Sequence, residues 1–421
     1  MPAKLIRNGT LIDGSGAEPI ANAAVLIENG RITGVGTVQS LAHRDGVEEI
    51  DAQGGYIMPG MIDTHVHVMA EGMDLIGQMQ KPFSFMFYQA IQYLARTLEC
   101  GVTSVRDAGG ADAGVKKAVE DGIIAGPRMQ ISISVLSTTG GHGDGYMPAG
   151  FPVPMIVPYP GNPDGIADGI DEVRKKVREI LRAGADVVKV CSTGGVLSAT
   201  DHPEFTQYCI DELKVMVEEA RFRKGLKVMA HAQGAEGIKN AVRAGIHSIE
   251  HGMFIDDEAI ELMLEAGTYL VPTLVAPLGV IEEAEATGTM PEYGLRKAKE
   301  TLEIHRESIA KAYKAGVKIA MGTDAGVVPH GTNLRELGLM ADVGMTPMDV
   351  IVATTKTAAE CMGWDDRVGT LEAGKLADVV VTSVNPLTHI HDLANNDNIA
   401  LVIKGGDIAK DRRSARVLAE A

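Results

Sequence analysis

Six polar residues of metal-binding type stand at the ends of apolar segments in this chain. The first two close the run Gly60-Met61-Ile62-Asp63-Thr64-His65-Val66-His67. Side chains two apart on a strand point the same way, so both imidazoles can reach one metal ion. Imidazole and carboxylate are common ligands of zinc and similar ions. The pattern predicts a metal-dependent hydrolase whose site residues are His65, His67, Lys189, His231, His251 and Asp324.

Each member of this set has a plainer explanation when it is taken alone. His65 and His67 would serve as strand histidines bonded to backbone, and His231 and His251 as satisfied core histidines. Asp324 stands before Ala325-Gly326 and could simply cap a turn. Only the whole set, in this order and at strand ends, favours a metal site.

Lys189 is the most informative member, because it interrupts the apolar run from Asp186 to Cys191. A buried ammonium is costly unless it is paired, and burial lowers a lysine pKa. A neutral amine can add carbon dioxide, and the two oxygens of the resulting carbamate could bridge two metal ions. The alternative is a structural lysine paired with Asp186 or another carboxylate. Alone, the residue favours the ion pair; within the set, we favour the carbamate.

The middle of the chain alternates strand and helix patterns. The helix patterns include 170–183, 211–224 and 295–315. Glycines follow or precede many of these helices, as expected for caps; they include Gly184, Gly225, Gly245, Gly267 and Gly316. Eight βα units in about 300 residues is the size of a (β/α)₈ TIM barrel, in which catalytic groups lie at the carboxyl ends of the strands. All six residues satisfy that rule on the eight candidate strands, which are 62–67, 102–106, 130–135, 187–191, 227–230, 248–249, 269–272 and 318–321.

Both ends of the chain read instead as short strands with turns. Asn29-Gly30 between two apolar runs is a strong hairpin signal. We therefore predict an α/β protein with two domains. Residues 58–358 would form the metal-dependent hydrolase barrel, and residues 1–57 and 359–421 would pair into a small β-sandwich domain.

Composition limits the partners. A formal net charge of −17 argues against nucleic acid and against an anionic membrane. The four cysteines form no C-x-x-C pair, which fits a reducing compartment, and neither a signal peptide nor a membrane span is predicted. A cytoplasmic enzyme with a small-molecule substrate is the expectation.

Several segments together resemble the amidohydrolase superfamily over nearly the whole chain. Two more resemble its imidazolonepropionase-related branch, which contains Xaa-Pro dipeptidases and amidases of N-acyl amino acids. The superfamily segments are 59–67, Lys189, His231, 249–252 and 322–324; the branch segments are Thr139–Asp144 and His330–Leu337. The resemblance implies that His65, His67 and Asp324 hold one divalent ion, that His231 and His251 hold a second, and that carboxylated Lys189 (N6-carboxylysine) bridges them. Zinc is the expected metal, and relatives are commonly homo-oligomers.

That arrangement implies amide hydrolysis. Two ions about 3.5–4 Å apart hold a bridging hydroxide of lowered pKa. Asp324 would be the general base, and His142 would stabilise the oxyanion if its loop reaches the site. The alternative for His142 is a mobile histidine between glycines. The expected substrates are dipeptides, Xaa-Pro or similar, or N-acyl amino acids.

Substrate-binding candidates are His142, Gln233, His202 and His330. Dipeptidase relatives often carry an aromatic residue two positions after the fifth-strand histidine. Gln233 stands there in this chain, which argues against strict prolidase activity. His202 belongs to a loop over 192–208 that is either a pocket lining or a solvated segment. Arg106 and Arg128 are cationic candidates for a substrate carboxylate, and a structural ion pair is favoured for each.

Three rival functions remain. Deaminases carry a glutamate three residues after the fifth-strand histidine, where this chain has Gly234. Cyclic amidohydrolases of the imidazolonepropionase type are mononuclear and lack the lysine. A non-catalytic assembly protein would have lost its ligands. Metal content separates the hydrolase from the assembly protein, because about two ions per chain favour the enzyme and none favours the assembly protein.

Overall fold

The computed structural model describes residues 3–41, 46–72, 74–154, 156–288 and 290–413. Within them the chain is an α/β protein with parallel sheets. Its strands are β1 (Lys4–Leu11), β2 (Ile20–Glu28), β3 (Arg31–Thr37), β4 (Glu48–Asp51), β5 (Tyr56–Pro59), β6 (Met61–Val66), β7 (Val102–Asp107), β8 (Arg128–Ile131), β9 (Val135–Leu136), β10 (Val187–Cys191), β11 (Lys227–Ala232), β12 (Ser248–His251), β13 (Tyr269–Val271), β14 (Val379–Thr382), β15 (Ile399–Lys404) and β16 (Asp407–Asp411). Its helices are α1 (Leu75–Met79), α2 (Phe85–Glu99), α3 (Ala113–Glu120), α4 (Gly169–Ala183), α5 (Ile210–Phe222), α6 (Ala235–Ala244), α7 (Asp257–Ala266), α8 (Val275–Thr287), α9 (Glu292–Ala315), α10 (Arg335–Asp342), α11 (Pro347–Thr354) and α12 (Lys356–Met362), with 3-10 helices η1 (Ile390–Ala394) and η2 (Asn396–Asn398).

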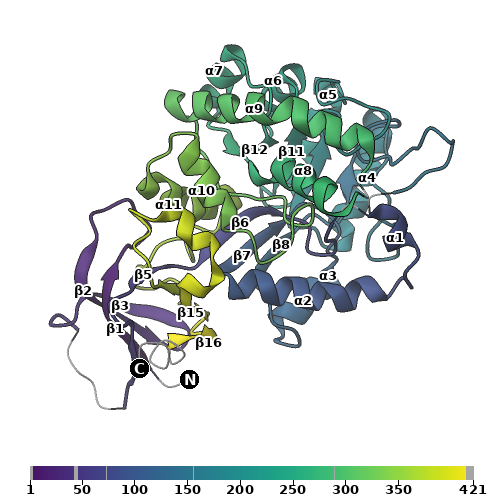
Figure 1. Cartoon of the computed structure of the whole chain (residues 1–421). Coiled ribbons are helices and arrows are strands. Elements are labelled where there is room, and N and C mark those ends of the chain that lie inside the picture. The colour runs from purple at the N-terminus through teal and green to yellow at the C-terminus, as the bar shows by residue number, and fades with distance from the viewer. Residues whose placement is uncertain (1–2, 42–45, 73, 155, 289, 414–421) are drawn as a thin grey trace.

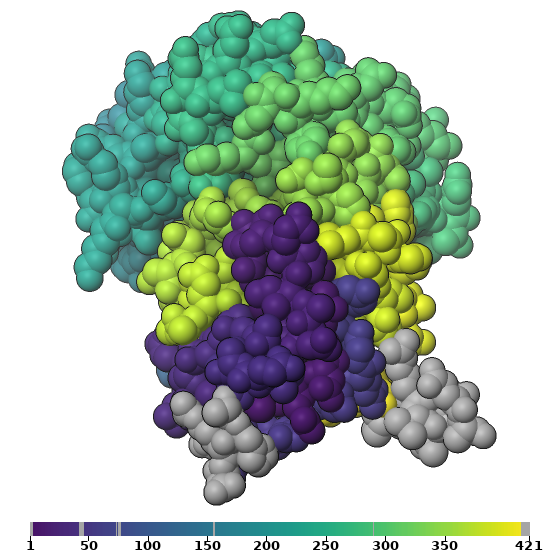
Figure 2. All heavy atoms as spheres, turned by 90° about the vertical axis from the view of Figure 1, so that its left-hand side faces the viewer, coloured from purple at the N-terminus to yellow at the C-terminus, as the bar shows by residue number. Residues whose placement is uncertain are grey.

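The two ends of the chain share one sheet, with strand order β16-β15-β14-β5-β1-β2-β3 and β4 paired to β1. Asn29 and Gly30 turn the β2–β3 hairpin with φ values of 52° and 75°, the left-handed region that this turn requires. Residues from both ends fill a common core that includes Ile6, Val25 and Leu401. In Figure 2 the purple N-terminal residues lie directly between yellow-green and yellow C-terminal ones.

The central strands form two parallel sheets, β6-β7-β8 and β9-β10-β11-β12-β13. All five residues of β10 are buried, as expected for parallel strands covered on both faces. Helices α4, α5, α6 and α7 pack on one another in sequence, and α5 and α6 also contact β11 (Figure 1). Isolated parallel bridges join Ile319 to Leu270 of β13 and Ala325 to Val66 of β6. The helices therefore cover the strands while the carboxyl ends of the strands meet at one edge.

The predicted α/β class with parallel strands is confirmed, but two predicted strands are not. The segment 130–135 is divided between β8 and β9, because Ile133 takes a φ of 67° that an extended strand cannot hold. The segment 318–321 forms one isolated bridge, at Ile319. Gly184, Gly245, Gly267 and Gly316 do cap helices, whereas α5 ends at Phe222 and its C-cap is Arg223, two residues before Gly225.

The predicted domain boundary at residue 57 falls inside β5, so that this strand continues past the boundary toward β6. No helix among the described residues is long and apolar enough to cross a membrane.

Candidate metal centre and active site

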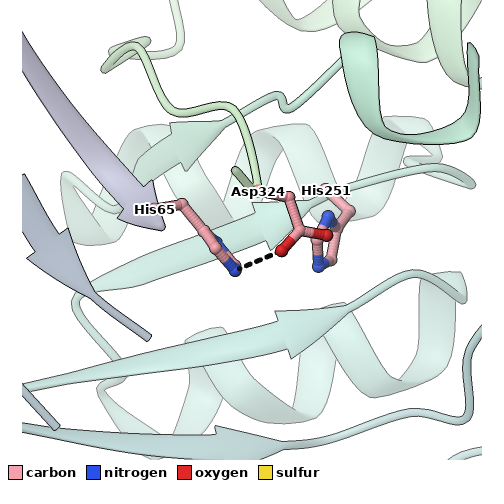
Figure 3. A group of neighbouring side chains, drawn as sticks. All are labelled: His65, His251 and Asp324. Atoms are coloured by element: carbon pink, nitrogen blue, oxygen red, sulfur yellow. Dashed lines mark ion pairs between the residues drawn. The ribbon is translucent and has the colours of Figure 1, made fainter. Parts of the chain in front are cut away.

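Four strand ends and the loop after Ile319 bring the six predicted residues together. His65 lies in β6 with His67 just beyond it; Lys189, His231 and His251 lie in β10, β11 and β12; and Asp324 follows the Ile319 bridge. His231 is inside its strand rather than after it, opposite Cys191 of β10. Figure 3 shows the His65 ring and the Asp324 carboxylate pointing toward each other, with the His251 ring beside Asp324. Ligand atoms of these three residues all lie within 4.8 Å of one another.

Short distances connect the rest of the cluster. Asp324 Oδ1 lies 3.3 Å from His67 Nε2 and 3.5 Å from His65 Nε2. Lys189 Nζ lies 3.4 Å from the same His65 nitrogen. The ring centroids of His231 and His251 are 4.7 Å apart, and those of His65 and His251 are 5.1 Å apart. Four strands and the loop that carries Asp324 thus present one compact set of nitrogen and oxygen atoms.

Each of the four strand-end histidines has one ring nitrogen held by a partner outside the cluster. The partners are Glu250 Oε2 at 2.8 Å from His65 Nδ1, Gly109 O at 2.9 Å from His67 Nδ1, Gly194 O at 3.0 Å from His231 Nε2, and Thr273 Oγ1 at 2.7 Å from His251 Nδ1. Metal-binding histidines are oriented in this way, with the second nitrogen left for the ion. The donor set therefore fits a divalent metal centre.

Two buried carboxylates support these ligands. Glu250 pairs with Arg106 at 3.0 Å while it holds His65. Asp63 accepts hydrogen bonds from the backbone N–H and hydroxyl of Thr323 and from the backbone N–H of His65. The loop that carries Asp324 is thereby tied to β6.

Lys189 is buried, and no carboxylate among the described residues lies within 4.0 Å of its ammonium. Asp186, the partner that an ion pair would use, binds Lys116 at 2.7 Å instead. Burial lowers the pKa of Lys189. An unpaired buried amine is the form that can react with carbon dioxide.

Burial also lowers the pKa of His65, His231 and His251 well below the ordinary value, so these rings are neutral, as metal binding requires. Burial acts in the opposite direction on Asp324, but its hydrogen bond to His67 and the charges around it hold the pKa of this carboxyl below its usual range. Asp324 is therefore ionised.

The backbone is strained at two of the six positions. His251 has a φ of 73° and Asp324 a φ of 61°, values in the left-handed region that cost a non-glycine residue about 1–3 kcal/mol. Such conformations persist where the surrounding structure imposes them, which is frequent at functional sites.

A cavity of about 510 Å³ opens above the cluster. Its walls include all six residues, as well as His142 and Gln233. The His142 ring stacks on that of His231 at 4.3 Å. Gln233 is buried, and its Oε1 has no hydrogen-bond partner among the described residues, so it is available to a ligand. Much of the remaining wall is apolar, with Met79, Phe83, Met86, Val157 and Val280.

His202 and His330 are not brought to this cavity. His202 contacts Phe205 and Glu204 on the loop. His330 is buried behind the site, where its Nε2 lies 3.2 Å from His67 O and its ring stacks on Tyr93. Arg106 and Arg128 pair with Glu250 and Asp378, which agrees with the structural explanation favoured for both.

Sequence reasoning missed the groups that hold the histidines. Glu250 could have been suspected, because it is a charged residue inside the buried strand Ser248–His251. The carbonyls of Gly109 and Gly194 carry no signal in their residue type. The apolar wall comes from α1, α2, α8 and loops that are distant in sequence.

The chain is similar to several known proteins over nearly its whole length. Residues 56–409 match the amidohydrolase family. Ochratoxinase from Aspergillus niger is 36% identical over 425 residues, which cover 96% of this chain and 86% of that protein. The crystal structure of a Xaa-Pro dipeptidase with methionine bound in its active site superposes with a TM-score of 0.87 at 35% identity, covering 96% of this chain and 99% of that one. Imidazolonepropionase from Rhizobium rhizogenes is 25% identical and covers 94% of this chain and 95% of its own.

Proposed function

The chain belongs to the amidohydrolase family and is a hydrolase of amide bonds, and we propose that it is a binuclear metal enzyme acting on dipeptides or N-acyl amino acids. The observation that carries the proposal is the outer hydrogen bond on each of the four strand-end histidines, which leaves one nitrogen per ring for an ion.

His65, His67 and Asp324 would hold one ion, and His231 and His251 the other. Lys189, as its carbamate, would bridge them, and the lack of a carboxylate partner for its amine among the described residues supports this role. Zinc is the metal that we propose, because imidazole nitrogen and carboxylate oxygen suit it. The ions would supply an activated water and polarise the substrate carbonyl.

The chain's own residues would then move the protons. Ionised Asp324 accepts the proton of the attacking water and returns it to the leaving nitrogen of the amide. His142, stacked on His231 at the cavity wall, stabilises the oxygen of the tetrahedral intermediate. The buried Oε1 of Gln233 accepts a hydrogen bond from the substrate.

The cavity favours substrates with a sizeable apolar group. Its volume of about 510 Å³ exceeds what a small dipeptide fills, and its outer wall carries Met79, Phe83 and Val157. Among the described lining residues the lysines are Lys81 and Lys189, with no arginine. We therefore propose that an N-acyl amino acid or a dipeptide with an apolar side chain binds better than a small polar dipeptide.

The sheets and their bridges also support a proposal for the domain architecture. We propose that the two parallel sheets and the segment at Ile319 are parts of one (β/α)₈ barrel over residues 58–358, since the bridges at Ile319 and Ala325 join β13 to β6. Residues 1–57 and 359–421 would form the β-sandwich domain around the shared terminal sheet.

The test is a substrate screen on zinc-loaded protein with N-acyl amino acids, Xaa-Pro and other dipeptides, ochratoxin and imidazolonepropionate. We expect hydrolysis of apolar N-acyl amino acids or dipeptides and about two zinc ions per chain by mass spectrometry. Hydrolysis of imidazolonepropionate alone, with one ion per chain, would overturn the proposal.

The variant Lys189→Ala tests the proposed carbamate bridge. Loss of the bridge should lower metal content and remove most activity, and ¹³C-labelled bicarbonate should give a carbamate signal in the parent protein but not in the variant. A Lys189→Ala protein with two ions and normal turnover would contradict the carbamate.

A further inference from the structure

A group of buried and partly buried polar residues outside the metal cluster contacts His142. Ser198 Oγ lies 2.9 Å from His142 Nδ1, and the Asp201 carboxylate accepts the Ser198 hydroxyl. The backbone N–H of His142 is itself bonded to the Gln207 side chain, which donates to Asp201 as well. His142 is therefore held at its ring by Ser198 and at its backbone by Gln207.

The direction of the two hydrogen bonds that join His142, Ser198 and Asp201 follows from the number of protons on each group. A serine hydroxyl has one proton to donate, and its oxygen can also accept. Because Ser198 gives its proton to Asp201, its oxygen must accept the Nδ1–H of His142. Any contact that His142 makes with a substrate is then made through Nε2, the nitrogen without a partner among the described residues.

Lys297 of α9 anchors the loop that carries these groups. Its ammonium donates to the carbonyls of Gly195 at 3.0 Å, Ser198 at 2.8 Å and Asp201 at 2.6 Å. The side chains of both Lys297 and Asp201 are only 3% exposed, and the ammonium lies 3.7 Å from the carboxylate. All three ammonium protons are thus used on one short loop.

The same loop touches the metal cluster. Gly194 O is the partner of His231 Nε2, and a Cβ at Gly195 would lie 2.3 Å from the His142 ring. The loop therefore packs closely against the His142 ring and His231.

We propose that Ser198, Asp201 and Lys297 are positioning residues that fix His142 with its Nδ1–H on Ser198 and its Nε2 directed into the cavity. The catalytic consequence rests on the proposed function, since only there does His142 stabilise a developing oxyanion. The placement of the ring stands on the contacts alone.

A double-mutant cycle tests the catalytic consequence. Ser198→Ala should lower kcat about tenfold with little change in KM on the best amide substrate of the screen, because a loosened ring loses its alignment. Ser198→Thr, which keeps the hydroxyl, should restore most of the rate. In a His142→Gln background, Ser198→Ala should cost nothing further. An equal loss in both backgrounds would mean that Ser198 acts on the fold and would overturn the proposal.

Lys297→Met extends the test to the anchor. We expect a larger loss of kcat than for Ser198→Ala, with zinc content retained. Lys311→Met is the control, since Lys311 is a half-exposed lysine on the same helix that pairs with Asp257. Equal kcat values for the two lysine variants would count against the anchor.

A readout without substrate separates this proposal from the proposed function. In ¹⁵N-histidine spectra of the zinc-loaded protein, the His142 signals are those lost in His142→Gln. We expect a single Nδ1–H form in the parent protein and mixed forms in Ser198→Ala. If the parent hydrolyses no amide, the proposed function fails while these spectra still test the positioning. Unchanged spectra in Ser198→Ala would refute it.

Discussion

At the scale of single residues, the site depends on the hydrogen-bond partners that orient the histidines as much as on the histidines themselves. Each strand-end histidine uses one nitrogen on a fixed partner, and those partners come from four different segments. Removing such a partner leaves the ligand present but free to rotate. The cost should therefore appear in metal affinity.

Thr273→Val makes that cost measurable. The variant keeps the shape of the side chain but removes the hydroxyl 2.7 Å from His251 Nδ1. We expect zinc affinity to fall about tenfold, measured by competition with a chelator. Thr382→Val is the control, because its buried hydroxyl binds Val384 O in the terminal sheet. Equal affinities in the two variants would show that the Thr273 contact is not used.

The convergence of the six residues could be predicted because their residue types are unusual at the ends of apolar strands, and their role as ligands stays a prediction. Their helpers could not be predicted, since a backbone carbonyl such as Gly194 O has no sequence signal. His330 was misplaced for a related reason: its segment lies close to the site, but its ring faces Tyr93 and the back of His67.

At the scale of elements, apolar periodicity predicted the strands β10 to β13 and the long helices well. It failed at 130–135, where the pattern continues but the backbone turns at Ile133. It also failed at 318–321, where a short apolar run forms one isolated bridge at Ile319 and bonds β6 through Met321 O, which accepts the Thr64 N–H. Periodicity records which side chains are buried, and backbone hydrogen bonding decides the strand.

His247 links two elements and gives a pH prediction. Its Nε2 lies 3.1 Å from Cys361 O, joining the start of β12 to α12, and burial lowers its pKa to about 4. Below about pH 6.5 the unfolded chain takes up a proton that the folded chain refuses, so stability falls as pH drops from 6.5 toward 4. The full effect is about 3 kcal/mol.

The variant His247→Gln keeps an N–H donor but does not titrate. Chemical denaturation at several pH values should show a smaller loss of unfolding free energy for this variant than for the parent between pH 6.5 and 4. Parallel curves for the two proteins would contradict the assignment.

At the scale of the whole molecule, the terminal sheet joins the N-terminal and C-terminal segments of the chain. Strands β14 and β15 bury Val379, Val381, Leu401 and Ile403 against residues of the N-terminal strands. Burying four such side chains contributes about 6–12 kcal/mol, which is comparable to the stability of a whole domain. The C-terminal strands are therefore needed for folding.

Truncation of the chain tests whether the C-terminal strands are needed for folding. A chain that ends at residue 378 lacks β14 to β16 and should give no soluble, cooperatively melting protein. A chain that ends at residue 413 keeps all three strands and should melt like the parent by circular dichroism. A folded protein from the shorter chain would disprove the requirement.

This closure also has a consequence for biosynthesis. β5 ends at Pro59 and its neighbour β14 begins at Val379, so the ribosome must add the whole central part of the chain between them. At ordinary elongation speeds this takes roughly 15–65 s. During that interval the first strands have emerged with an unpaired edge, which is prone to aggregate. Expression in cells should thus depend on chaperones that shield nascent chains, even though the finished protein leaves this edge paired.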